Sequence, residues 1–251
     1  MRHVLAAQIA ALDAELFSHI KNTTTDEDRK ALLAIHNALA CRNGSFSYLE
    51  IGSERGGSLQ ALIADPRCTR IVSIDPRTHW TPDDRPDQPQ VEYAENTTDR
   101  MLMLLQGVPG ADLSKLKTVE ASTESLDPRE FERPDFCFID GEHTHAAALR
   151  DARFCREAMQ GRGVIAFHDF HIVERAILEF LRETPRPRRG YLLLHAVFVV
   201  ELGGVSSLLD DPAVRSRLTP RSRLMTKLAA LDTWLLAADI RRRKRARATP
   251  A

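Results

Sequence analysis

The chain lacks several features that would place it at once in a well-marked class. Its four cysteines include no CxxC pair, and Cys137 and Cys155 lie inside apolar patterns, as reduced core residues do. No uninterrupted apolar run reaches membrane-spanning length. Gln8 and Asp13 interrupt the mildly apolar N-terminal segment, which argues against a signal peptide. These absences predict a cytoplasmic protein with no membrane span.

The chain also lacks net charge, but its charges are unevenly distributed. Residues 215–251 hold eleven Lys and Arg against two Asp, which leaves 24 basic and 33 acidic residues in the rest of the chain. An acidic body argues against a large nucleic-acid footprint over the main domain. The basic tail is open to three interpretations: a solvated end, a membrane-surface helix or an RNA contact.

The length of 251 residues and the hydrophobic content of 43% predict one soluble globular core with an added helical layer. We divide the chain into an N-terminal helical cap (1–44), an α/β domain (45–205) and a C-terminal helix with the basic tail (206–251). The cap contains helical periodicity over 3–21 and 26–40, and Thr25 with Asp28 resembles a capping box. The leucine stripe from Leu224 to Leu235 is expected to pack on the body or on a second subunit rather than on lipid, so a homo-oligomer stays open.

Short apolar runs alternate with helical segments through the α/β domain. The expected strands cover 47–51, 71–74, 116–121, 136–139, 164–167, 191–196 and 197–202, and the expected helices cover 59–64, 96–105, 143–159 and 173–183. This alternation predicts a doubly wound, mostly parallel α/β sheet in which one closing strand is antiparallel. Segment 76–95 carries four prolines and many charges, so it is expected to be a lid or a disordered loop.

The stretch from Asp135 to Asp169 is predicted to be a strand, a helix and a second strand. Both strands of such a parallel crossover end at the same edge of the sheet, where open α/β sheets place their sites. Four polar residues close these strands and are expected to gather there: Asp140, His143, His168 and Asp169. Taken singly, Asp140 could be only a turn residue, and Asp169 only a cap of the next helix.

An ExGxxxGGS motif at residues 50–58 lies between a strand and a helix. Its glycines let the backbone approach a ligand closely. The spacing is neither GxGxxG nor a P-loop, and Glu50 at the strand end suits a cationic amino group better than a pyrophosphate. Asp75 ends the next strand, where an acid can accept both hydroxyls of a ribose. Ser122, at the end of the third strand, would lie near an adenine.

Four segments in this order, YLEIGSERGGS, IVSID, FCFIDGEHTHAAALRDA and GVIAFHD, resemble the class I S-adenosylmethionine-dependent methyltransferases. The likeness extends over about residues 24–204 and is greatest to the macrocin-type small-molecule O-methyltransferases, with cephalosporin-hydroxylase-like proteins among the relatives. It implies a Rossmann-like methyltransferase fold with a seven-stranded sheet and added terminal helices. It also implies an S-adenosylmethionine site formed by Glu50, Gly52, Ser53, Gly56, Ser58, Asp75, Ser122 and Asp140.

The same resemblance bears on the chemistry. Macrocin-type relatives carry Asp-x-x-His after the fourth strand and an acidic pair after the fifth; these bind a divalent metal, and the His acts as base. Asp140 and His143 match the first motif and are implied as catalytic residues. Asp140, His168 and Asp169 are implied as metal ligands, with His168 in place of one acid. Oxygen ligands suit Mg²⁺, whereas an imidazole shifts the preference towards Mn²⁺, Fe²⁺ or Zn²⁺.

The sequence therefore predicts an S-adenosylmethionine-dependent methyltransferase that methylates a hydroxyl of a small molecule, such as a glycoside or another secondary metabolite. His143 would be the general base, with help from a divalent metal. Two alternatives stay open. One is a hydroxylase-like, non-methylating relative on the same fold, and the other is an RNA-binding methyltransferase, which only the basic tail motivates.

Overall fold

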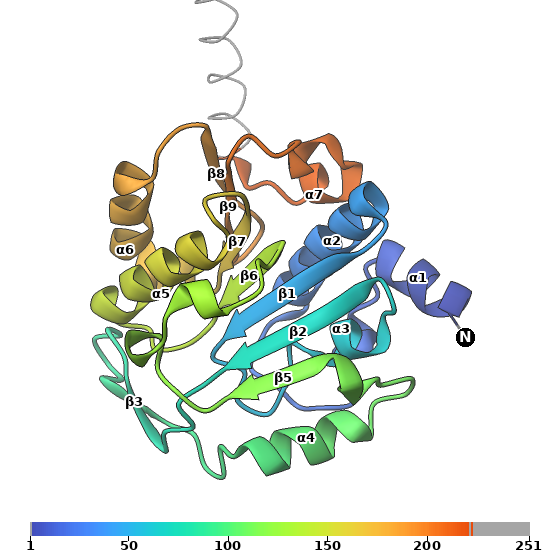
Figure 1. The fold of residues 1–251 in the computed structure, drawn as a ribbon, viewed down its shortest axis with the longest axis horizontal. Coiled ribbons are helices and arrows are strands. Elements are labelled where there is room, and N and C mark those ends of the chain that lie inside the picture. The colour runs from blue at the N-terminus through green and yellow to red at the C-terminus, as the bar shows by residue number, and fades with distance from the viewer. Residues whose placement is uncertain (1, 221, 223–251) are drawn as a thin grey trace, which may run out of the picture.

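The structure is a computed structural model that describes residues 2–220 and residue 222 (Figure 1). The leucine stripe from Leu224 to Leu235 and the basic segment from Arg241 to Arg247 lie outside the described residues. Among those that are described, no helix is long and apolar enough to span a membrane.

A seven-stranded sheet with the order β5-β2-β1-β6-β7-β9-β8 forms the centre of the fold. Its strands are β1 (Phe46–Ile51), β2 (Cys68–Ile74), β5 (Leu116–Val119), β6 (Phe136–Ile139), β7 (Gly163–Phe167), β8 (Arg188–Leu192) and β9 (Phe198–Leu202). β9 is antiparallel to both of its neighbours, and the pairs formed by the first five strands are parallel. The predicted doubly wound, mostly parallel seven-stranded sheet is confirmed.

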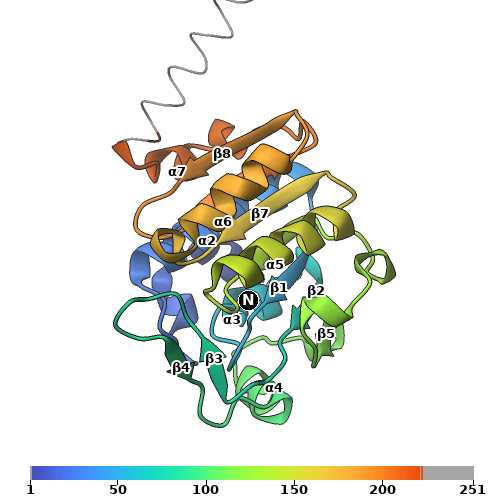
Figure 2. The ribbon, with the colours of Figure 1, turned by 90° about the vertical axis from the view of Figure 1, so that its left-hand side faces the viewer.

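Helices cover both faces of the sheet (Figures 1 and 2). The α-helices are α1 (Arg2–Ala10), α2 (Asp26–Asn43), α3 (Gln60–Ala64), α4 (Thr98–Gln106), α5 (His145–Ala158), α6 (Phe170–Glu183) and α7 (Pro212–Ser216). Short 3₁₀ turns are η1 (Ala14–Phe17), η2 (Leu113–Lys115), η3 (Thr123–Ser125), η4 (Pro128–Glu130) and η5 (Leu208–Asp210). One layer contains α2, α3 and α4, and the other contains α5 and α6.

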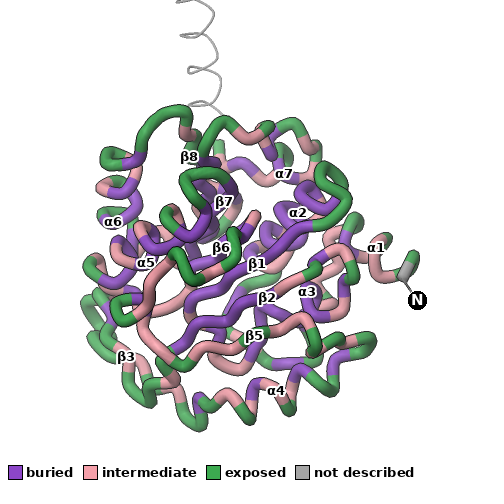
Figure 3. The backbone as a smooth tube through the Cα atoms, in the orientation of Figure 1, coloured by how far each residue is buried: buried purple, intermediate pink, exposed green. Residues whose placement is uncertain are grey.

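Alternation along the strands divides the core between the two layers. Tyr48 of β1 belongs to the cluster that packs on α2, α3 and α4, whereas Leu49 belongs to the cluster that packs on α5 and α6. Figure 3 shows the central strands buried along their length, as expected for a sheet covered on both faces. Glu50 has the same parity as Tyr48 and therefore faces the α2 and α3 layer.

The N-terminal cap differs from its prediction in one helix. The helix expected over 3–21 ends at Ala10, because Leu12 adopts a left-handed conformation (φ 56°) and Asp13 caps a new 3₁₀ turn through the N–H of Glu15. The capping box of α2 is present as expected, with both reciprocal hydrogen bonds between Thr25 and Asp28.

The proline-rich segment 76–95 contains a small antiparallel hairpin, β3 (Trp80–Pro82) paired with β4 (Gln90–Glu92). Both strands are only three residues long, so the composition correctly excluded a long strand but did not reveal the pairing. Residues just after β3 contact the segment that precedes α5. Asp83 forms an isolated parallel β-bridge with His143, in which the N–H of Asp84 donates to the His143 carbonyl over 3.1 Å. Figure 2 shows the hairpin at the same end of the molecule as the start of α5.

Candidate functional site

The carboxyl ends of the central strands meet at one edge of the sheet. Ile51 of β1 is in register with Ile74 of β2 and with Ile139 of β6, and Ile139 is in register with Phe167 of β7. The residues that follow each strand therefore lie side by side, and a cavity of about 580 Å³ opens along them. Six of the eight residues predicted for the cofactor line this cavity: Gly52, Ser53, Ser58, Asp75, Ser122 and Asp140.

Gly52 makes the closest backbone approach at this edge. Its φ is +84°, and a Cβ placed on it would lie 2.3 Å from the carbonyl oxygen of Asp140 and 2.4 Å from the Cα of Gly141. A side chain at this position would therefore separate the ends of β1 and β6. The sequence predicted that the glycines let the backbone approach a ligand closely. In the structure, Gly52 also allows the end of β1 to approach the backbone that follows β6.

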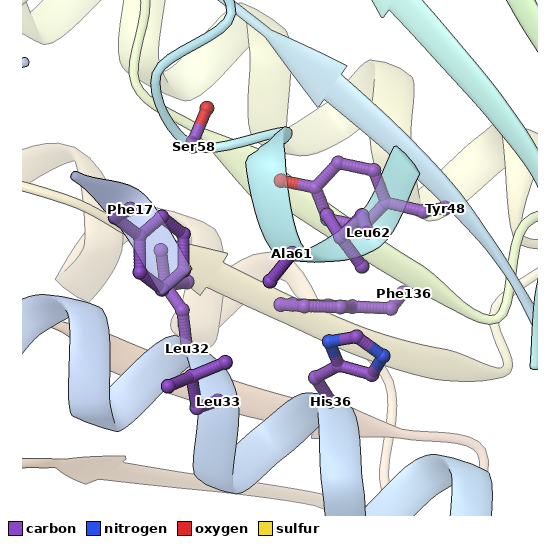
Figure 4. A pocket seen from close by; sticks show the side chains of 9 residues that line it. All are labelled: Phe17, Leu32, Leu33, His36, Tyr48, Ser58, Ala61, Leu62 and Phe136. Carbon is purple, nitrogen blue, oxygen red and sulfur yellow. The ribbon is translucent and has the colours of Figure 1, made fainter. Parts of the chain in front are cut away.

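Glu50 and Gly56, the other two predicted cofactor residues, do not line the cavity. Glu50 is fully buried, and its carboxyl oxygens accept hydrogen bonds from the hydroxyls of Ser58 and Tyr48. Figure 4 shows Tyr48 and Ser58 on the wall of a separate small cavity beside α2. Gly56 packs instead on Leu105 of α4. Glu50 thus contacts Ser58 from the face of the sheet that α2 and α3 cover, because its strand parity turns the side chain towards that face.

Burial raises the pKa of Glu50 to about 8, with the charges of Asp140 and Asp75 acting in the same direction and the hydrogen bonds from Ser58 and Tyr48 opposing it. The native carboxyl therefore keeps its proton at pH values where the unfolded chain, with an ordinary value near 4.5, has released it. Unfolding releases a proton between these two values, so rising pH favours the unfolded state.

We therefore predict that Glu50→Gln stabilises the protein at pH 8 by on the order of a few kcal/mol relative to wild type. The neutral amide carries no ionisation cost, so the advantage should shrink as the pH falls towards 4.5. Urea unfolding of both proteins at pH 5 and pH 8 measures the difference, and the exposed Glu120→Gln serves as a control. Equal stabilities at both pH values would contradict the assignment.

Asp75 keeps its predicted place at the end of β2 and is held there by backbone donors. Its Oδ2 accepts the N–H of Glu54 over 2.9 Å, and its Oδ1 accepts the N–H of Arg77 over 2.8 Å. The Asn96 amide also donates to Oδ1 over 3.4 Å, and Nη1 of Arg77 lies 3.5 Å from Oδ2. Asp75 lines the cavity, where a carboxylate can accept further hydroxyl donors. Ser122 lies farther along the edge and caps η3 through the N–H of Glu124.

The four residues expected at the ends of β6 and β7 come together on the other side of the cavity. Nδ1 of His168 lies 2.9 Å from Oδ1 of Asp140, and Nε2 of His143 lies 3.6 Å from the same oxygen. Asp169 lies 3.5 Å from Nε2 of His143 and 3.8 Å from Nδ1 of His168. The sequence identified this cluster, and the register of β6 with β7 assembles it.

Neighbouring charges outweigh burial in setting the pKa values of Asp140 and His168. Burial alone would raise the pKa of Asp140, but the charge of His168 and the interactions with His143 outweigh it and hold that pKa well below its usual range. Burial disfavours the charged form of His168, yet Asp140, Asp28 and Asp169 raise its pKa well above the ordinary value. Both shifts favour the charged forms, an imidazolium at His168 and a carboxylate at Asp140.

Ring nitrogens of His143 and His168 are buried without a hydrogen bond within the described part of the chain. Nε2 of His143 and both ring nitrogens of His168 have no hydrogen-bond partner among the described residues, although His168 lies within ion-pair distance of Asp140. The two groups are close enough for an ion pair, but the carboxylate oxygen does not lie in the direction that a hydrogen bond from the imidazole ring requires. Such unsatisfied buried atoms are costly, and convergent ones indicate a missing partner.

These residues fit a divalent ion. One ligand atom from each of Asp140, His143 and His168 lies within 4.8 Å of the others. Two ligand atoms that each lie about 2.1 Å from one ion are roughly 3 Å apart when at right angles, close to the separations in the cluster. His143 thus joins two of the expected ligands, Asp140 and His168, whereas Asp169, the third expected ligand, does not belong to this group.

Asp169 does not cap the helix that follows it. It adopts a left-handed conformation (φ 48°) with no side-chain cap hydrogen bond to α6. Its Oδ2 instead lies 2.5 Å from Nη2 of Arg85, which belongs to the hairpin segment. A strained non-glycine residue whose side chain is turned towards a cavity is typical of functional sites.

Two carboxylates stand behind the histidines, and sequence reasoning missed both in this role. Oδ2 of Asp83 lies 3.1 Å from Nδ1 of His143, and Oδ2 of Asp28 lies 3.5 Å from Nε2 of His168. Asp28 was noted only as part of the α2 cap, and Asp83 was one of many charges in segment 76–95. No local pattern could reveal either contact, because the partners are 60 and 140 residues away.

The chain is similar to proteins of known family and known structure. A protein-family model described as a methyltransferase domain matches residues 49–170. A search of curated proteins found no match. The MycE methyltransferase from the mycinamycin biosynthetic pathway, in complex with Mg and SAH, is 16% identical with a TM-score of 0.52; the match covers 78% of this chain and 55% of that one.

Two further solved structures are similar. An O-methyltransferase from Bacillus cereus in complex with SAH is 12% identical with a TM-score of 0.50, and the match covers 79% of this chain and 90% of that one. A spermidine synthase bound to a transition-state analogue is 14% identical with a TM-score of 0.47, over 72% of this chain. The chain spans only 60% of that synthase's length. The first of these and MycE establish the fold.

Proposed function

We propose that this protein, in which residues 49–170 match a methyltransferase-domain model, transfers a methyl group from S-adenosylmethionine to a hydroxyl of a small molecule such as a glycoside. The observation that carries the proposal is the cluster of Asp140, His143, His168 and Asp169, which faces the same cavity as Asp75 and Gly52. One end of the cavity thus suits a nucleoside, and the other places His143 where it could take a proton from an acceptor hydroxyl.

We assign the cofactor to the glycine-loop side of the cavity. Asp75 would accept both ribose hydroxyls, Ser122 would lie near the adenine, and Gly52, Ser53 and Ser58 would border the methionine end. Glu50 supports that end from beneath through Ser58. Asp140, which lines the same cavity, marks the boundary between cofactor and acceptor.

This assignment predicts that Asp75→Ala raises the dissociation constant for S-adenosylmethionine by roughly 10- to 100-fold for each ribose hydroxyl it serves, because hydrogen bonds to a charged group contribute about 1.5–3 kcal/mol. Isothermal titration measures the affinity, and Asp99→Ala, an exposed acid on α4, is the matched control. Thermal melting checks that the variant remains folded. Unchanged affinity in a folded Asp75→Ala protein would refute the cofactor site.

In the proposed reaction the acceptor oxygen attacks the methyl carbon in line with the departing sulfur. The C–O bond forms, the S–C bond breaks, and the hydroxyl proton moves to Nε2 of His143. Holding the three reacting atoms in line can contribute about 7–11 kcal/mol. A positioned base typically adds roughly 10²–10⁴-fold. Asp83 behind Nδ1 stabilises the imidazolium that results.

Asp140, His168 and Asp169 would hold a divalent ion beside the base. When bound, such an ion lowers the pKa of an acceptor hydroxyl and orients its oxygen. The mixed nitrogen and oxygen set favours Mn²⁺, Fe²⁺ or Zn²⁺ over Mg²⁺. Nε2 of His143 lies within the same ligand group, so this nitrogen can hold either a proton or an ion, and we assign it to the proton.

The helical cap contributes to this site. Asp28, at the start of α2, is buried and contacts His168, and its Oδ1 accepts the N–H of Ala196 over 3.1 Å. Residues 22–24, which line the cavity, and Asp28 therefore form part of the proposed active-site wall. We retain the domain division at residues 44 and 205 and a cytoplasmic location as proposals.

A further inference from the structure

We infer that Asp83 is a positioning residue for His143, and that the segment 80–92 that carries it is part of the active site. This inference rests on the proposed function of His143 as the base. It concerns the orientation of the ring, which the sequence motif Asp-x-x-His leaves undetermined. The observation behind it is a buried carboxylate supplied to the ring by a segment that is otherwise largely exposed.

The burial of Asp83 needs an explanation. The residue is 5% exposed, whereas Trp80 in the same hairpin is 53% exposed. A carboxylate that leaves water pays a large desolvation cost unless it is paired and hydrogen-bonded. Asp83 is fully engaged: its Oδ1 accepts the N–H of Arg85 over 2.8 Å, and its Oδ2 lies 3.1 Å from Nη1 of Arg85 and 3.1 Å from Nδ1 of His143.

The pairing fixes which nitrogen of the neutral ring carries the proton. A carboxylate only accepts hydrogen bonds, so Nδ1 of His143 must be the donor to Asp83. The lone pair then belongs to Nε2, which lies near Asp140 and Asp169 and has no hydrogen-bond partner within residues 2–220. A base held by a third group in this way is oriented before the acceptor arrives.

The neighbours of Asp83 dock the segment onto the same place. The N–H of Asp84 donates to the His143 carbonyl, and the carboxylate of Asp84 accepts the N–H of His145 over 2.7 Å. Arg85 pairs with Asp169. Three consecutive residues thus contact the ring, the backbone and the opposite acid of the cluster. Because the hairpin also lines the cavity, an acceptor that contacts the hairpin would affect the orientation of His143 through Asp83.

Asp84 provides a matched control, because it anchors the segment without contacting the His143 ring. In Asp83→Asn, the Arg85 N–H should keep its hydrogen bond by donating to the amide oxygen of the new side chain. The amide NH₂ would then face Nδ1 of His143. The neutral ring would then carry its proton on Nε2. We expect this exchange in ¹⁵N–¹H spectra of histidine-labelled full-length protein at alkaline pH, whereas Asp84→Ala and Asp83→Glu should keep the wild-type tautomer.

The same proteins are then assayed for S-adenosylhomocysteine release with a panel of hydroxylated glycosides. Asp83→Asn should lower kcat by at least roughly 100-fold with unchanged S-adenosylmethionine affinity, and Asp83→Glu should recover much of it. An unchanged His143 tautomer in a folded Asp83→Asn protein would overturn the inference. If wild type methylates no member of the panel but the tautomer exchange occurs, the acceptor proposal fails while the positioning role stands.

Discussion

Replacing His143 by alanine is expected to lower the rate of methyl transfer by roughly 10²–10⁴-fold, because the acceptor hydroxyl loses the group that takes its proton. The affinity for S-adenosylmethionine should not change, since we assign His143 to the acceptor side of the cavity. Turnover is followed by S-adenosylhomocysteine release, and affinity by isothermal titration. His145→Ala is the matched control, because His145 is two residues away and pairs with Glu179 instead.

A titration with Mn²⁺ separates the two uses of the His143 nitrogen. With Asp140, His168 and Asp169 as the ligands, His143→Ala should keep its Mn²⁺ affinity, whereas His168→Ala should lose it. If His143→Ala loses the ion as completely as His168→Ala does, His143 is a ligand and not the base. This experiment needs no acceptor, so it decides the point even before the substrate is identified.

Gly52→Ala is expected to destabilise the protein by about 2–5 kcal/mol and to weaken cofactor binding. The left-handed backbone costs an alanine about 1–2 kcal/mol, and overpacking typically adds about 1–3 kcal/mol. The added methyl would meet the Asp140 carbonyl and the Gly141 Cα, which are backbone atoms that cannot rotate away. Separating the ends of β1 and β6 would also shift Asp140 relative to Asp75.

Gly161→Ala distinguishes backbone strain from collision. Gly161 has a comparable φ of +70°, but a Cβ there would meet nothing within 4 Å. This variant should lose only about 1–2 kcal/mol and keep its cofactor affinity. Urea unfolding and isothermal titration of the two variants provide the comparison. Equal losses in both would mean that the approach of β1 to β6 has no special importance.

Much of the candidate site could be predicted because it depends on local order. Apolar runs identified the central strands, and the polar residue after each strand had to lie at one edge of a parallel sheet. Asp75, Asp140, His143, His168 and Asp169 were therefore identified from their positions in the sequence. The buried position of Glu50 could not be predicted, because a motif indicates proximity to the edge, whereas strand parity decides which face the side chain occupies.

The sequence by itself determined the sheet, its active edge and the residue types that gather there, since strand ends and turns are local properties. Only the tertiary structure decided how those residues are oriented. Asp83 reaches His143, Arg85 reaches Asp169, and Asp28 reaches His168 across long stretches of chain. Such pairings depend on how a proline-rich segment and an N-terminal helix fold back onto the edge. They form because buried charges need partners, and no local pattern specifies which partner a charge will find.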